Sequence, residues 1–455
     1  MVNLIVLSLL FLIGLCRWVF IKGLGQKGGH ILISLLVQTL PFAYGKGIYS
    51  FLQGQITEDY KSVRLGEFGN IIRVEFPLVF ILIFFVLGYH RFRSNAFSFK
   101  KNVWLWVLLV FCVISYLNPY NTFPLAFLVL AIPLLQFLFV IKYVDYNFSR
   151  LDILKGVFDG LMMITVLEFV LAICYPVLGL EFVATLFRDS AFEWSQRRGM
   201  TSAIGTFGHP GHLALYSLIM MGFFVSCYLN GFKSKWSGYL ILMNAVTLIL
   251  TFSRTTIICT VLIMPVLILI YYQGRKIFSL KSVVAYITLF MLLLAVVYVS
   301  PLSYLFLESD SNVQVTNRFV HWTLGYQMWD ISKWIGVGIN THVYYMLNKL
   351  NINIAADITL TDTFFFLRSP IHNIHIIVLA EAGLIGLITW IYFYWNRFIT
   401  YYKYCKTSNP VNNIFNLTFI SLLLGTFLYG FFGWTPMTME IYSMCLMLGY
   451  FANKT

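Results

Sequence analysis

The stretch KWSGYLILMNAVTLILTFSRTTIICTVLIMPVLILIYYQGR (residues 235–275) is strongly apolar and carries charge only at its two ends and at Arg254. If it were one helix, the 39 residues between Lys235 and Arg275 would be roughly 58 Å long, about twice the thickness of a bilayer core. The stretch therefore predicts a membrane hairpin that goes out and returns. Both basic ends would lie on one side of the membrane, and Arg254 would lie near the outward tip.

The composition of the whole chain agrees with this interpretation. Of its 455 residues, 59% are hydrophobic and only 11% are charged, and the mean hydropathy is +0.80. A soluble protein of this length could not bury so much apolar surface in one core. The apolar runs are continuous rather than alternating, which favours helices over the strands of a barrel. The sequence predicts an all-α, polytopic transmembrane bundle of about 12–14 spans.

The excess of cations does not indicate nucleic-acid binding. The net charge is +13, but the lysines and arginines form short clusters between apolar runs, as loop charges that set membrane orientation do. The seven cysteines lie in or beside apolar runs and form no CxxC pair. Neither a disulfide framework nor a zinc site is therefore indicated.

Alternate loops between the apolar runs are basic and hold 19 of the 31 lysines and arginines. Because cytoplasmic loops are enriched in these residues, this side is predicted to be cytoplasmic, with the N-terminus outside and the C-terminus inside. The first apolar run lacks a signal-peptide pattern, so we expect it to remain as a span. The expected spans are residues 2–20, 30–52, 73–90, 103–118, 122–141, 154–177, 209–230, 237–252, 255–273, 282–301, 372–396, 412–431 and 436–451.

This topology divides the chain into four segments. They are N-terminal helices (1–177), central helices with an outer loop and the hairpin (178–301), a large extracytoplasmic loop (302–371) and C-terminal helices (372–455). A loop of about 70 residues usually carries function or short helices of its own. Within it, Arg318, Trp322, Gly325 and Trp329 have helical spacing, which predicts a surface helix at 317–329.

Polar side chains from four distant segments map to the outer side of the predicted membrane. An arginine stays charged and pairs two phosphate oxygens at once, and a neutral histidine can take a proton from a sugar hydroxyl. Such a cluster suits an anionic, lipid-linked headgroup. The candidate residues are Arg198, His209, Arg254, Arg318, His372 and Asn373.

Several of these residues also have a purely structural interpretation. Arg254 at a hairpin tip could extend to lipid phosphates, and Asn373 could serve only as a helix cap. GTFGHPG (205–211) could be a turn that enters a helix, with His209 incidental to function. His372 could be a polar residue at the membrane interface.

The carboxylates are weaker candidates for functional residues than the arginines and histidines. Glu381 lies nine residues after His372, so on a straight helix it faces away from that histidine, and we interpret it as structural. An unpaired carboxylate there would cost roughly 2.5 kcal/mol or more, so we expect it to be paired or protonated. The outward pairs Glu58/Asp59 and Glu308/Asp310 could hold a divalent cation. Acidic residues in polar loops are usually solvated, and no metal site is predicted.

Four motifs resemble the O-antigen ligase/polymerase superfamily of bacterial surface-polysaccharide enzymes. Their order and spacing are similar to those of that family, whereas the N-terminal spans match it only in being hydrophobic. The motifs are RRGMTSAIGTFGHPG (197–211), LTFSRTT (250–256), NRFVHW…GVGIN (317–340) and HNIHIIVLAEAGLIGL (372–387).

The resemblance implies a glycosyltransferase of the C type that uses undecaprenyl-diphosphate-linked sugars without a metal or another cofactor. By motif, Arg198 and Arg254 would hold the diphosphate. Arg318 would help to position donor or acceptor, and His372, in its His-Asn pair, would be the catalytic base. Many members of the family carry an asparagine after the proline that follows His209, where this chain has glycine, so the role of His209 stays open.

The expected function is that of a capsule or O-antigen polymerase in the bacterial cytoplasmic (inner) membrane, with its active site on the periplasmic face. Its partners would be an undecaprenyl-diphosphate-linked oligosaccharide, the lipid bilayer and a chain-length regulator. A ligase that transfers glycan to a lipid A core differs only in the acceptor and stays an alternative. A lipid-linked oligosaccharide flippase would place ionisable residues within the spans. Here the charges gather outside, and Glu168 and Glu381 are exceptions.

Overall fold

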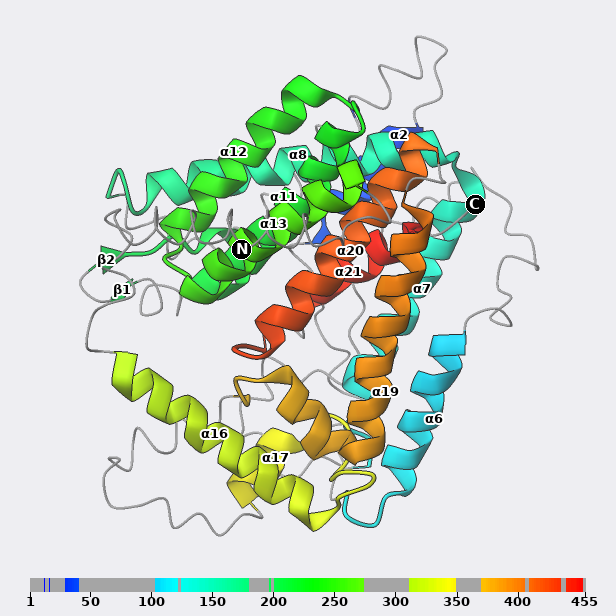
Figure 1. Ribbon diagram of the computed structural model, residues 1–455, viewed down its shortest axis with the longest axis vertical. Helices are drawn as coiled ribbons and strands as arrows, with labels where there is room; N and C mark the ends of the chain where they lie inside the picture. Colours follow the sequence, from blue (N-terminus) through cyan, green and yellow to red (C-terminus); the bar gives the residue numbers. More distant parts are fainter. Residues whose placement is uncertain are drawn as a thin grey trace.

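The computed structural model describes residues 12, 16, 29–40, 103–121, 124–179, 196–197, 200–273, 311–348, 370–405, 409–434 and 439–452. Most of these residues are helical (Figure 1). A short antiparallel pair of strands, β1 (Gln196–Arg197) and β2 (Met200–Thr201), is a small departure from the all-α prediction. Within the described part of the chain, five helices are long and apolar enough to cross a membrane. The predicted class, a polytopic helical membrane protein, is confirmed.

Helices occupy the predicted spans wherever the structure describes them. The hairpin at 235–275 is present as α12 (Ser234–Leu250) and α13 (Arg254–Gln273). The other helices at predicted spans are α2 (Gly29–Gln38), α6 (Val103–Leu117), α7 (Leu128–Asn147), α8 (Arg150–Cys174), α11 (Pro210–Leu229), α19 (Ile374–Tyr404), α20 (Pro410–Gly430) and α21 (Met439–Phe451). The predicted spans 73–90 and 282–301, and nearly all of 2–20, lie outside the described residues.

α11 is buried along almost its whole length and packs against α12, α13 and α20. Gly222 allows close contact with α20, because a Cβ atom there would lie 2.1 Å from Oγ of Ser421. The side-chain amide of Asn413 donates to Oδ1 of Asn230 at 2.8 Å. Since Asn413 begins α20 and Asn230 follows the end of α11, the two helices are antiparallel. The start of α11 therefore lies beside the end of α20.

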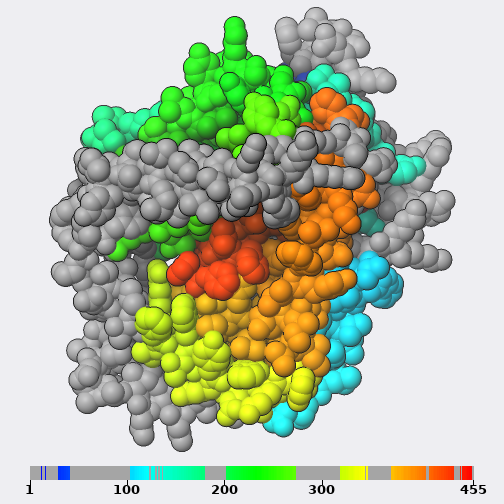
Figure 2. Space-filling view, viewed as in Figure 1, coloured from blue at the N-terminus to red at the C-terminus, as the bar shows by residue number. Residues whose placement is uncertain are grey.

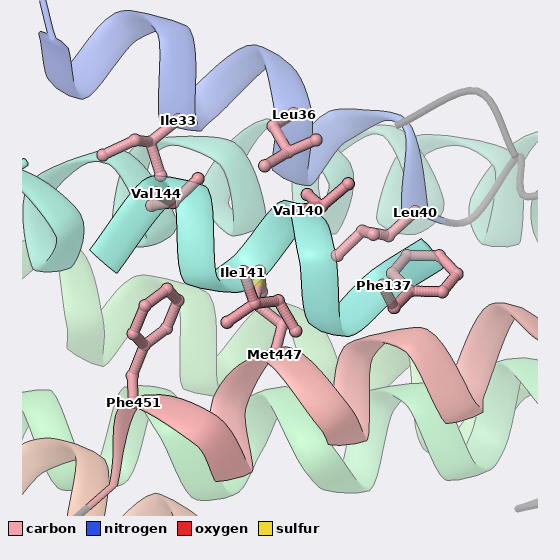
Figure 3. A pocket seen from close by; sticks show the side chains of 9 residues that line it. All are labelled: Ile33, Leu36, Leu40, Phe137, Val140, Ile141, Val144, Met447 and Phe451. Atoms are coloured by element: carbon pink, nitrogen blue, oxygen red, sulfur yellow. The ribbon is translucent and has the colours of Figure 1, made fainter. Parts of the chain in front are cut away.

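α2 packs closely on α8 through two glycines one turn apart. A Cβ atom at Gly156 would lie 2.5 Å from Cβ of Ile33, and one at Gly160 would lie 2.6 Å from Cβ of Val37. Small residues at this spacing let helices approach closely in membranes. The side chains drawn in Figure 3 fill the adjoining contact of α2 with α7 and α21, and all of them are apolar. We interpret this contact as packing.

α19 reverses direction part-way along its length. Gly383 has φ 67° and ψ −167°, a conformation essentially restricted to glycine. Trp390, in the second half, donates from Nε1 to Nδ1 of His375, in the first half, at 3.2 Å. On a straight helix these residues would be about 22 Å apart, so the two halves lie side by side. The predicted straight span at 372–396 was wrong in this respect, because hydrophobic periodicity does not reveal a reversal at one glycine.

The segment between α16 (Ser311–Ile331) and α17 (His342–Asn348) holds this reversal in place. The N–H of Leu384, just after Gly383, donates to the carbonyl of Lys333 at 2.9 Å. Oε1 of Glu381 accepts the N–H of His342 at 3.1 Å and lies 2.7 Å from its Nδ1. Glu381 is thus paired and anchors the start of α17, which agrees with the structural role inferred from the sequence.

The helix predicted at 317–329 is present within α16, but one side of it is buried rather than exposed. Leu324 and Met328 belong to a buried apolar cluster that also contains Ile376 of α19. Gly325 allows this approach, because a Cβ atom there would lie 2.3 Å from Cγ2 of Ile376. α16 is therefore packed on the first half of α19.

Candidate functional site

The entry to α11 is fixed by a buried carboxylate of α8. Glu168 accepts the N–H of Thr206 at 3.0 Å and also the Thr206 hydroxyl. Gly205 has φ +51°, and a Cβ atom there would lie 1.9 Å from Oε2 of Glu168, so this turn requires glycine. The turn leads into His209, whose Nδ1 accepts the N–H of Gly211 at 3.1 Å. His209 therefore caps α11, which supports its structural interpretation.

The start of α11 meets the end of α20 at a cluster of rings. A Cβ atom at Gly211 would lie 3.4 Å from the hydroxyl of Tyr429. The ring centroids of His209 and His212 are 4.6 Å apart. His212 contacts Trp434 edge to face, with ring centroids 5.6 Å apart. Trp434 packs in turn on the apolar cluster of α16 and α19. Figure 2 shows the end of α20 at the surface, between the yellow-green α16 and the green helices.

Arg318 lies on α16 near this meeting point. Its side chain is half-buried, and burial lowers the pKa of the guanidinium, while the nearby Tyr429 hydroxyl raises it. Even a lowered arginine pKa leaves the group charged at neutral pH. Because a half-buried cation is less screened by water, it would attract an anion more strongly than an exposed one.

His372 lies beside a second histidine, His321, one turn beyond Arg318 on α16. The two Nδ1 atoms are 3.3 Å apart, and the rings are nearly parallel, with centroids 5.4 Å apart. His321 is 1% exposed, whereas His372 is partly exposed. For a neutral pair, one Nδ1 must carry the proton and the other must accept it. The contact therefore couples the tautomers of the two rings.

Asn373 follows His372 and caps the first half of α19. Its Oδ1 accepts the N–H of Ile376 at 3.1 Å, and its side chain is buried. The cap fixes the point where the chain enters α19 and so the direction of the preceding His372. Contact of Asn373 with a substrate stays a prediction.

Replacing Asn373 by alanine is expected to lower the free energy of unfolding by about 1 kcal/mol, the usual value of a lost N-cap. Thermal unfolding of the purified protein in detergent measures this loss, and Asn373→Asp should restore most of it. Asn409→Ala is the matched control, because Asn409 caps α20 in the same way, at 2.9 Å from the N–H of Asn412. If Asn373 only caps, both alanine variants should lose similar activity; a far greater loss for Asn373→Ala would indicate substrate contact.

Arg254 begins α13 at the same end of the bundle as His209. The N–H of Ala203 donates to the carbonyl of Leu250 at 2.8 Å, which ties the segment before α11 to the turn before Arg254. One turn into α13, Ile257 clusters with Ala214, one turn into α11. The predicted tip of the hairpin is therefore at the end where α11 begins.

Arg198 and two pairs of carboxylates, which the sequence offered as candidates, fall outside the described residues. Arg198 lies between Arg197 and Met200, which pair as β-strands. The carboxylate pairs are those at residues 58–59 and 308/310. Among the residues that the structure does describe, no three histidine, cysteine or acidic side chains lie close enough together to hold a metal.

Comparison with known proteins gives an independent result for the segment that contains most of this geometry. Residues 239–391 match a protein family described as O-antigen ligase. This segment, about a third of the chain, is similar to that family. The matched segment runs from α12 into the second half of α19 and includes Arg254, Arg318 and His372. No curated protein matches the chain. The resemblance to the O-antigen ligase/polymerase superfamily is confirmed.

Three residues at or near this site were not predicted from the sequence. His321 could have been found, because it lies three residues after Arg318 on a predicted helix, and this spacing puts both on one face. Tyr429 lies in an apolar run and gave no signal. Glu168 was noted as a charge within a span, but its partner Thr206 is 38 residues away.

Proposed function

We propose that this protein is an O-antigen or capsule polymerase, an inverting glycosyltransferase. It would move a growing glycan from undecaprenyl diphosphate onto a lipid-linked repeat unit. The observation that carries the proposal is the contact between His372 and His321, one turn from Arg318. A paired imidazole beside a half-buried guanidinium suits proton removal next to an anionic leaving group.

In this proposal, His372 is the catalytic base and His321 positions it. Nδ1–H of His372 would donate to Nδ1 of His321, so that Nε2 of His372 accepts the proton of the acceptor hydroxyl. The acceptor oxygen forms a bond to the anomeric carbon as the bond from that carbon to the diphosphate oxygen breaks. The electron pair of the broken bond stays on the diphosphate. Attack from the opposite face inverts the anomeric configuration.

The arginines would stabilise the charge that develops on the departing diphosphate. Guanidinium groups aimed at such a leaving group contribute most where water is partly excluded. Arg318, half-buried beside Tyr429, meets this condition. Arg254 and Arg198 would complete the diphosphate site, and no metal ion would be needed.

The protein is a multi-pass membrane protein, and we propose that it lies in the bacterial cytoplasmic membrane. The basic loops would be cytoplasmic, and the end that holds His209 and Arg254 would face the periplasm. A lipid-linked donor could then reach the arginines from the outer leaflet.

The alternative is an O-antigen ligase, which would use a lipid A core as acceptor. The matched family is described as O-antigen ligase, and this match does not distinguish the two activities. The donor, the base and the arginines would keep the same roles, and only the acceptor hydroxyl would differ. The choice between the two activities depends on the acceptor alone.

The deciding experiment incubates the purified full-length protein with one lipid-diphosphate repeat unit. A ladder of products indicates a polymerase, whereas reaction only after addition of lipid A core indicates a ligase. Transfer is expected to persist in EDTA; a loss that Mg²⁺ restores would contradict metal independence. No transfer to either acceptor by protein that elutes as a single folded species would contradict the proposed activity.

A further inference from the structure

A groove lies between α6 and the second half of α19, apart from the site described above. The two helices lie side by side (Figure 1, Figure 2), and Trp104 of α6 contacts Phe393 of α19 edge to face at 4.8 Å. The volume of the groove is about 490 Å³, which is within the range of small-molecule sites. It uses none of the residues proposed for catalysis.

Most of the groove is apolar, and a cation lies at one end. Val107, Ile388 and Thr389 line the part away from Arg397, whereas Val103, Asn396 and Arg397 line the other end, with Tyr392 between them. Val103 is 66% exposed and Ile388 is 59% exposed, as side chains that face lipid are. A largely apolar groove that ends at a cation has the chemistry of a site for a lipid with an anionic headgroup.

Two aromatic rings contact the guanidinium group of Arg397. Its guanidinium carbon lies 5.7 Å from the ring centroid of Trp104 and 5.9 Å from that of Phe393. Contact with aromatic faces positions the planar group while its N–H edge can still donate. In the part of the chain that the structure describes, no carboxylate forms an ion pair with Arg397. A bound anion would supply a counter-charge to this guanidinium.

Aromatic side chains place the polar end at the level of lipid headgroups. Trp106 is 54% exposed and Trp395 is 64% exposed, on the two helices that form the groove. Exposed tryptophans gather at membrane–water interfaces. The sequence assigns Arg397 to the basic, cytoplasmic side, and basic pockets between helices on that side bind anionic lipids.

We propose that this groove binds one anionic phospholipid of the inner leaflet. Its phosphate would pair with Arg397 and Asn396, and an acyl chain would lie along Val107 and Ile388. This proposal is independent of the glycosyltransferase activity, and its test does not measure that activity.

The test is native mass spectrometry of the full-length protein purified in detergent, with added phosphatidylglycerol or phosphatidylethanolamine of the same acyl chains. One phosphatidylglycerol should be retained in preference to phosphatidylethanolamine. Arg397→Ala should weaken its binding about fivefold, the effect of one cation beside an anionic lipid surface. Ile388→Trp, which fills the groove without changing the charge, should also weaken it.

Lys403→Ala is the matched control, because Lys403 is an exposed cation on the same helix that does not line the groove. It should bind phosphatidylglycerol like the unmodified protein. Every variant should also have the elution volume and the melting temperature of the unmodified protein. Equal retention of the two lipids, or equal effects of Arg397→Ala and Lys403→Ala, would overturn the proposal. So would displacement of the lipid by excess inorganic phosphate, which would mean that the site recognises phosphate without the acyl chain.

Discussion

Replacing His372 by alanine is expected to abolish measurable glycan transfer, with a loss of about 10²–10⁴-fold in rate, while the protein still folds and inserts. The loss is large because a general base contributes this much to proton transfer in the transition state. The rate of product formation from a defined lipid-diphosphate repeat unit measures it. His30→Ala is the matched control, because His30 lies on the distant α2, and it should keep near-normal activity.

Substitutions at His321 test whether His372 acts as one of a pair of histidines or as a single catalytic histidine. His321→Ala should lower the rate but keep the KM for the donor, since His321 orients the base and does not bind the substrate. His321→Asn places an acceptor oxygen close to the position of Nδ1 and should restore part of the rate. Near-normal transfer by both His372→Ala and Arg254→Ala would remove the catalytic assignment. Near-normal transfer by His321→Ala would remove only the positioning role.

Replacing Gly383 by alanine is expected to lower the free energy of unfolding by about 2–5 kcal/mol. The backbone conformation of Gly383 is strained for any other residue, and a Cβ atom there would lie 2.3 Å from the carbonyl carbon and oxygen of Trp334. Backbone atoms cannot move aside as a flexible side chain can, so a steric cost adds to the conformational one. Thermal unfolding in detergent measures the loss.

Gly179→Ala is the control that separates the two costs. Gly179 has the same φ of +67° as Gly383, but a Cβ atom there would meet nothing within 4 Å. This variant should lose about 1 kcal/mol, the lower end of the conformational cost. If both variants lost the same stability, the close packing of Gly383 against Trp334 would be refuted. Gly383→Ala should also reduce glycan transfer, because the reversal sets the position of His372.

Most of the long helices in the described part could be predicted from the sequence, whereas α17, the two short strands and the reversal of α19 could not. Runs of apolar residues between basic clusters located the described spans, and the charge at Arg254 located the turn between α12 and α13. These properties are local, since the bilayer requires a certain length of apolar helix whatever its neighbours are. Placement of His209 and Arg254 at one end of the bundle followed from the same counting of crossings.

The detailed site could be predicted only in part. His372 and Arg318 were identified by residue type and motif, but the pairing of His372 with His321 joins residues 51 positions apart. Asn373 and His209 were predicted as ligands with structural alternatives, and their side chains cap helices. A cap is itself a local signal, whereas an additional contact with substrate depends on groups elsewhere in the fold.

By itself, the sequence determined that this chain is a multi-pass helical membrane protein and which residue types gather at one end of it. The tertiary structure alone decided that α19 reverses at Gly383, that His321 lies beside His372, and that Glu168 secures the entry to α11. The reason is physical. Membrane crossing depends on the summed hydrophobicity of neighbouring residues, whereas a reversal at one glycine and a pairing of two imidazoles depend on contacts between distant segments.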